Sequence, residues 1–146
     1  MQSAVAVLGR LLISPIFIFS AIHKFTTWND TVGQLDAQLE ETLGRTLADP
    51  TAAVLLGIAA TVEIVGGLMV LFGCGARLGA LALFLFLIPT TAVFHDFWTF
   101  SGAERMNEMQ HFMKNVTIMG GLLMIVALGP GGASVDRRRE RRAGRV

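Results

Sequence analysis

Four long apolar stretches constrain the fold of this chain more than any other feature of its sequence. They cover about residues 4–22, 52–72, 77–94 and 112–128. A helix needs roughly 20 residues to cross a hydrocarbon core of about 30 Å, and each stretch approaches that length. The stretches are continuous and rich in Leu and Ala, without the alternation of a membrane barrel. The sequence therefore predicts an all-α fold, a four-helix transmembrane bundle.

The composition supports a membrane protein. Of the 146 residues, 53% are hydrophobic and 16% are charged, whereas a soluble domain has roughly 45–50% apolar and 25% charged residues. A soluble fold of this size must cover its surface with charge. The single cysteine, Cys74, excludes an internal disulfide and a Cys-x-x-Cys redox pair. Any redox chemistry is therefore expected to need a bound cofactor or a partner.

Basic residues predict the orientation in the membrane. Six of the 12 Lys and Arg residues lie in the last ten positions, and Arg77 follows the second apolar stretch. The loops at the other end, about 23–51 and 95–111, are acidic. Short cytoplasmic loops are enriched in Lys and Arg. We expect an inner (plasma) membrane protein with both termini cytoplasmic, a membrane domain over 1–130 and a basic tail over 131–146. With a net charge of +1, nucleic acid is not expected as a partner.

The first apolar stretch has some features of a signal peptide, because Phe19-Ser20-Ala21 resembles a cleavage site. No positive charge precedes Arg10, however, and the apolar part is long. We interpret this stretch as a retained helix.

An amphipathic helix is predicted in the first outer loop. Apolar residues recur there at steps of three or four, with polar residues between them. The start signals are Thr31 with Gln34, which have the spacing of a capping box. Such a helix would lie on the membrane or cover the outer end of the bundle. Its apolar positions are Val32, Leu35, Leu39, Leu43 and Leu47.

Other capping signals bound the spans. Asp49-Pro50 predicts an N-cap and first-turn proline for the second span. Ser101 with Glu104 predicts that the fourth helix begins near Gly102 and projects beyond the membrane. The run Gly-Pro-Gly-Gly after Leu128 predicts its end.

Polar residues inside or at the edge of apolar helices are the candidate functional residues, because charges at bilayer depth are costly unless paired or hydrated. Lys24 and Arg10 lie about 21 Å apart along one helix, so they cannot share a small ligand. We expect Arg10 to pair with Glu63 or to reach the cytoplasmic surface. Glu63 lies near the middle of the second span, and an interhelical pair beside Gly66 and Gly67 is the structural interpretation of it.

The outer ends of three helices are predicted to converge on one polar mouth containing Lys24, His95 and Lys114. His95 precedes a carboxylate and can pass a proton near neutral pH. It is followed by Trp98, which equally fits an interfacial aromatic belt. On the fourth helix, His111, Lys114 and Asn115 share one face. That face could bind a carbonyl, an anion or a quinone head group, or simply contact the interface.

Metal binding is not predicted. Glu108-x-x-His111 has the spacing of half a di-iron site, but a full site needs a second such pair and two further carboxylates. A mononuclear site from His23, His95 and His111 is a minor alternative that lacks strict metal spacing.

Four short motifs, one in or beside each span and in order along the chain, resemble the DoxX family of small four-helix membrane proteins. They are Arg10-Leu-Leu through Ser20-x-x-x-Lys24-Phe, Glu63-x-x-Gly66-Gly67, Phe94-His95-x-Phe97-Trp98, and Phe112-Met-Lys114-Asn115 with Gly120-Gly121. The resemblance implies a four-helix bundle with both termini cytoplasmic.

The same resemblance implies a function in membrane redox chemistry. Some members of the family are associated with thiosulfate:quinone oxidoreduction, and others with membrane oxidoreductase complexes that handle thiol or oxidative stress. It also implies that Lys24, Glu63, His95, Lys114 and Asn115 form the polar set of the family.

Two interpretations remain open from the sequence. In the first, the chain is a subunit of a redox or respiratory assembly, with an outward pocket for a quinone, lipid or small anion. In the second, it is an accessory protein whose polar groups fix helix packing and whose outer loops dock a partner. Expected partners are membrane lipids and either other subunits or further copies of the chain. A small-solute transporter is less favoured, because one four-helix unit leaves little room for alternating access.

Overall fold

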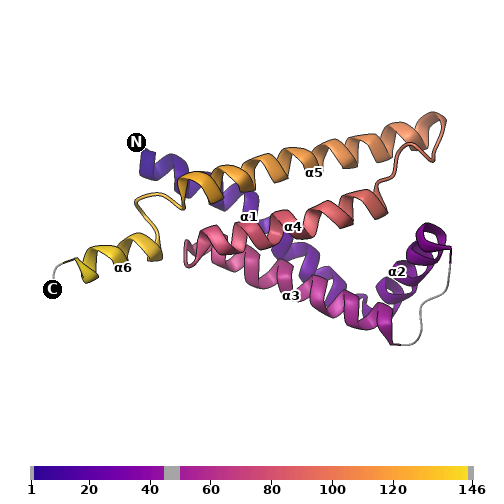
Figure 1. Cartoon of the computed structure of the whole chain (residues 1–146), viewed down its shortest axis with the longest axis horizontal. Coiled ribbons are helices and arrows are strands. Elements are labelled where there is room, and N and C mark those ends of the chain that lie inside the picture. Colours follow the sequence, from indigo (N-terminus) through magenta and orange to yellow (C-terminus); the bar gives the residue numbers. More distant parts are fainter. Residues whose placement is uncertain (1, 45–49, 145–146) are drawn as a thin grey trace.

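The computed structural model describes residues 2–44 and 50–144 and contains six helices in this part of the chain (Figure 1). They are α1 (Gln2–Thr26), α2 (Trp28–Leu43), α3 (Thr51–Phe72), α4 (Ala76–Phe94), α5 (Gly102–Leu128) and α6 (Val135–Ala143). No strand occurs in the described ranges. The predicted all-α class is confirmed.

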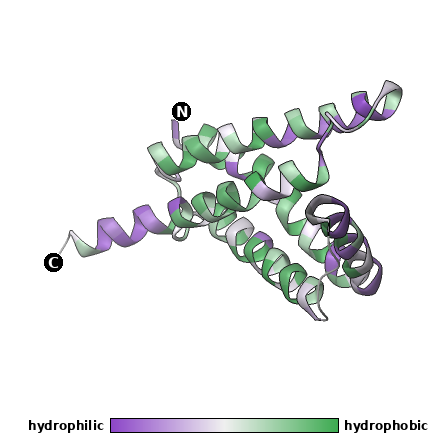
Figure 2. Cartoon of the chain, turned by 45° about the vertical axis from the view of Figure 1, so that its right-hand side comes forward, coloured by the Kyte–Doolittle hydropathy of each residue, from purple (hydrophilic) through white to green (hydrophobic). Residues whose placement is uncertain are grey.

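The four predicted spans are present as α1, α3, α4 and α5, each long and apolar enough to cross a membrane. Large apolar side chains point outward along them, including Leu12, Phe19 and Leu128, which are 73%, 68% and 71% exposed. Lipid can solvate such side chains, whereas water would not. Figure 2 shows the spans as mainly hydrophobic and α2 and α6 as mainly hydrophilic.

Helix α5 extends well beyond its apolar stretch. Its 27 residues give a length of about 40 Å, which exceeds a hydrocarbon core of about 30 Å. The helix begins at Gly102 and ends at Leu128, as predicted, with Ser101 at the N-cap and Gly129 at the C-cap. The Ser101 side chain makes no capping hydrogen bond, so the predicted capping box is wrong although the boundary is right.

The amphipathic helix of the first loop is also present, but it begins earlier than predicted. Thr27 is the N-cap of α2 and makes no side-chain capping bond. The predicted Thr31–Gln34 capping box is wrong, because Thr31 lies within the helix and its hydroxyl donates to the Thr27 carbonyl. Pro50 lies just before α3 rather than in its first turn. Asp49 and Leu47 lie outside the described residues.

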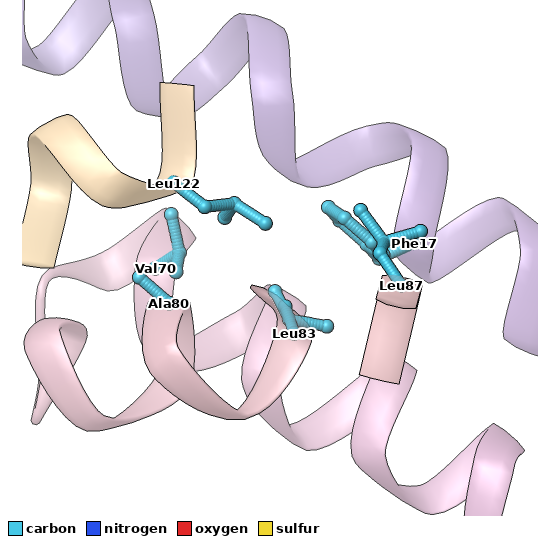
Figure 3. Packing of buried hydrophobic residues seen from close by; sticks show 6 residues of the cluster. All are labelled: Phe17, Val70, Ala80, Leu83, Leu87 and Leu122. Atoms are coloured by element: carbon cyan, nitrogen blue, oxygen red, sulfur yellow. The ribbon is translucent and has the colours of Figure 1, made fainter. Parts of the chain in front are cut away.

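The spans pack in a continuous order: α1 on α3, α3 on α4, and α4 on α5. Helix α2 lies against α3, with smaller contacts to α4 and α1. The core between the spans is formed by Phe17 of α1, Val70 of α3, Leu83 and its neighbours on α4, and Leu122 of α5 (Figure 3). Helices α1 and α5, the two ends of this order, pack much less against each other.

Close helix approach depends on glycine, as predicted for Gly66 and Gly67. A Cβ atom on Gly66 would lie 2.8 Å from Leu83 Cγ and 3.3 Å from the Gly79 carbonyl oxygen of α4. A Cβ atom on Gly67 would lie 3.1 Å from Ile18 Cγ1 of α1. Adjacent glycines therefore let α3 contact a different neighbour on each side, which is a common packing mode in membrane bundles.

The basic tail contains α6, which is attached to the turn between α3 and α4. Gly73 and Gly75 in that turn have positive φ angles of 66° and 61°, which glycine adopts without strain. The Asp136 carboxylate accepts from the amides of Gly75 and Ala76 at 2.8 and 3.1 Å, and the Asp136 amide donates to the Gly73 carbonyl. Asp136 thus caps the N-terminus of α4, where a negative charge is favourable.

Candidate functional site

Glu63 is the central buried charge of the spans and is 4% exposed. Lys24 of α1 donates to both of its carboxylate oxygens, at 3.0 and 2.8 Å. Ser20, one turn before Lys24, donates to Glu63 Oε1 at 2.9 Å and accepts from Lys24 at 2.6 Å. These three residues form a closed hydrogen-bonded group that joins α1 to α3.

Of the two alternatives predicted for Arg10, pairing with Glu63 is wrong, because Lys24 is the partner of Glu63. Arg10 lies at the other end of α1 and donates to the carbonyls of Leu71 at 3.3 Å and Ala133 at 2.7 Å. Leu71 is eight residues beyond Glu63, about 12 Å along α3. Side chains on a helix lean toward its N-terminus. On α1 this direction leads from Lys24 toward the middle of the span, where Glu63 of α3 lies.

Two histidines stack at the junction of α4 and α5. The rings of His95 and His111 are nearly parallel, with centroids 5.1 Å apart and an interplanar angle of 15°. Glu108 contacts His95 Nδ1 at 2.8 Å, and Lys114 Nζ contacts His111 Nδ1 at 3.0 Å. We call His95, Glu108, His111 and Lys114 the histidine cluster.

The partners of the two rings set the tautomer of each ring in its neutral form. An ammonium group has only donors, so Nδ1 of His111 accepts from Lys114 and the ring proton lies on Nε2. An ionised carboxylate only accepts, so Nδ1 of His95 carries a proton that it donates to Glu108. Within the described residues neither Nε2 atom has a hydrogen-bond partner. When both rings are neutral, His111 Nε2 is a free donor and His95 Nε2 is a free acceptor.

An aromatic wall adjoins the cluster. Phe97, Trp98 and Phe112 pack edge to face, with ring centroids 5.3 to 6.2 Å apart. Phe112 follows His111 directly in α5, and Phe97 is two residues after His95. The cluster and the wall together provide polar groups beside an apolar surface, the combination typical of small-ligand sites.

Asn115 lies apart from the free ring atoms, one turn deeper on α5. It is 7% exposed and its amide donates to the Thr91 hydroxyl at 3.1 Å. This bond joins α4 to α5, as the Glu63 group joins α1 to α3. Such bonds between membrane helices stabilise packing by roughly 1 kcal/mol.

The predicted outer mouth thus divides into separate groups. His95, His111 and Lys114 come together, and Trp98 lies in the adjoining wall. Lys24 and Asn115 have their hydrogen bonds elsewhere. Glu108 was not among the predicted ligand-binding residues, although its spacing of three from His111 already placed both on one helical face.

A metal centre finds no support in the described part of the chain, where no three His, Cys, Asp or Glu side chains are grouped to hold an ion. The minor alternative of a site from His23, His95 and His111 does not match this arrangement.

Comparison with known proteins agrees with the resemblance in the sequence. A family model described as DoxX matches residues 5–96, and one described as the SURF4 family matches residues 51–142. The inner membrane protein YqjF of Escherichia coli is 33% identical over 88% of this chain and 87% of its own length. The inner membrane protein YphA of the same organism is 28% identical over 90% of this chain and 87% of its own length. The Surfeit locus protein 4 homolog of Drosophila melanogaster is 31% identical over 54% of this chain and 31% of its own length. No solved structure matches.

Proposed function

Because the chain belongs to the DoxX family of membrane proteins, we propose that it is the membrane subunit of a redox assembly and binds a quinone head group at the histidine cluster. The stacked His95–His111 pair carries the proposal. With both rings neutral, one free ring nitrogen donates and the other accepts, which matches a ligand that alternates between a carbonyl and a hydroxyl group.

The position of the cluster suits a lipid-soluble ligand. His111 lies 17 residues before the end of α5, about 26 Å along the helix. That distance is close to the thickness of a hydrocarbon core, about 30 Å. A head group could therefore reach the cluster while its isoprenoid chain remains among the lipids.

The residues of the cluster have distinct roles in this proposal. His111 Nε2 donates to a quinone carbonyl, and Lys114 holds that ring in the donating tautomer. His95 Nε2 accepts a proton from a quinol hydroxyl, and Glu108 stabilises the resulting cation. In this direction the quinol loses two protons, one to His95 Nε2 and one to water, and two electrons. The electrons pass to a partner protein, since the lone Cys74 cannot form a redox disulfide within the chain.

The two tryptophans of the chain offer a direct binding test. Trp28→Phe leaves Trp98 of the aromatic wall as the only tryptophan. We expect a short-chain ubiquinone analogue to quench Trp98 fluorescence saturably in detergent. Loss of one ring hydrogen bond, in His95→Ala or His111→Ala, should weaken binding roughly tenfold.

His23→Ala is the matched control, because His23 is the third histidine and lies exposed on α1. Its dissociation constant should equal that of the parent protein. Quenching that does not saturate, or that is the same in all three histidine variants, would contradict the proposal and favour an accessory protein without a ligand.

A further inference from the structure

A groove between α1 and α5 opens at the end of the bundle opposite to the histidine cluster. Its volume is about 800 Å³, and its walls include Val5, Gly9 and Ile13 of α1 and Met124 and Leu128 of α5. A smaller space of about 340 Å³ continues it toward Ile16 and Ile118. The groove lies between α1 and α5, which are the two ends of the packing order and make few contacts with each other.

A second, cationic space adjoins the groove near α6. Its volume is about 750 Å³, and it shares Gln2 and the segment 128–131 with the groove. Three arginines line it, Arg77, Arg137 and Arg141, together with Asp136 and Glu140.

The two carboxylates of this space already have partners. Asp136 binds the amides at the start of α4, and Glu140 forms an ion pair with Arg137 at 2.8 Å. Arg77 and Arg141 form no ion pair with any described residue. The space therefore has two arginines available to an anion.

A buried arginine adds to the positive charge at this end. Arg10 lines the groove and is 4% exposed. Its guanidinium binds only carbonyl oxygens, and its Nε atom has no hydrogen-bond partner among the described residues. A buried cation without a carboxylate within 4 Å is costly, and a nearby anion would lower that cost.

We propose that the groove and the cationic space together form a binding site for one anionic phospholipid. The phosphate group lies between Arg77 and Arg141, and an acyl chain lies in the groove. From Val5 to Ile16 the groove follows α1 for about 16 Å, which is half of a hydrocarbon core of about 30 Å and so the depth of one leaflet.

The test uses native mass spectrometry of the full chain with equal amounts of dioleoyl phosphatidylglycerol and dioleoyl phosphatidylcholine. We expect one retained lipid per chain, with phosphatidylglycerol preferred. Each of Arg77→Gln and Arg141→Gln should lower the preference roughly fivefold, the usual effect of one basic residue near an anionic lipid. Arg138→Gln and Arg139→Gln lie on α6 outside the lining and serve as charge-matched controls.

A second pair of variants tests the groove itself. A Cβ atom on Gly9 would enter open space, and Gly9 lines the groove, so Gly9→Phe should fill it and abolish retention of both lipids. Gly120→Phe also extends into open space but does not line the groove, and should leave retention unchanged.

Three results would overturn the proposal. Equal effects of Arg138→Gln and Arg77→Gln would mean diffuse attraction to the tail. Retention unaffected by Gly9→Phe would place the lipid elsewhere. A dimer that excludes lipid would mean that a second copy of the chain fills the groove.

Discussion

Lys24 and Glu63 show how a charge is tolerated among apolar helices. The Glu63 side chain is 5% exposed and that of Lys24 is 20% exposed, so the pair is largely removed from solvent. Removing one partner of a buried pair leaves the other charge uncompensated, whereas removing both does not. The pair is therefore expected to be needed as a unit.

We predict that Lys24→Met lowers stability by about 3–5 kcal/mol, the usual cost of an uncompensated buried charge. The double variant Lys24→Met with Glu63→Met should be clearly more stable than Lys24→Met alone. Thermal melting in detergent measures both.

The surface pair of Arg137 and Glu140 is the control, because its side chains are 57% and 62% exposed. Arg137→Ala should cost less than about 1 kcal/mol. A double variant that is no more stable than Lys24→Met alone would argue against a coupled pair.

The residue types of the site could be predicted from the sequence, but not their partners. The hydropathy pattern alone identifies Arg10, Lys24 and Glu63 as costly charges in apolar helices. Which cation reaches Glu63 depends on the relative level of α1 and α3 and on side-chain direction. Neither is contained in the hydropathy pattern of a single helix. The same holds for Glu108, whose partner His95 belongs to another helix.

The sequence predicts which helices are present better than it predicts the residues at which each helix begins and ends. The four spans follow directly from the length of apolar sequence needed to cross a bilayer. The extra residues of α1 and the early start of α2 do not follow from that length. A helix can continue past its apolar region until a residue or a turn ends it. The sequence predicts only a basic tail where α6 forms. Its local signals were Ser134 as N-cap and Asp136 in the first turn.

A methyl group added to a glycine should have different effects at Gly66, where α3 contacts α4, and at Gly120 of α5. Gly66→Ala should destabilise the protein by about 1–3 kcal/mol, because its Cβ would meet the fully buried Leu83. Gly120→Ala should be neutral or stabilising by up to about 1 kcal/mol, since a Cβ there meets nothing within 4 Å and alanine favours a helix. Equal melting temperatures of the two variants would contradict close α3–α4 packing.

The whole molecule is polarised along its spans. One end carries α6, the Gly73–Gly75 turn and the arginine-lined space. The other end carries α2 and the histidine cluster. Enrichment of arginine near the first end predicts that it faces the cytoplasm.

This orientation predicts the labelling pattern of a thiol reagent that does not cross membranes. Cys74 is the only cysteine and lies in the turn beside α6. In intact cells it should stay unlabelled until the membrane is permeabilised. Glu41→Cys in a Cys74→Ser background should react at once, because Glu41 is exposed on α2. Labelling of both positions from the same side would contradict the topology.

The histidine cluster as a quinone site is the central functional claim, and photoaffinity mapping tests it most directly. The full chain in native membranes is irradiated with a quinone that carries a photoreactive group on its head, and the labelled peptides are sequenced. We predict labelling within residues 95–98 and 108–114, which is lost with excess unlabelled quinone and in His111→Ala. Labelling confined to the α1–α5 groove, or unchanged in His111→Ala, would contradict the claim.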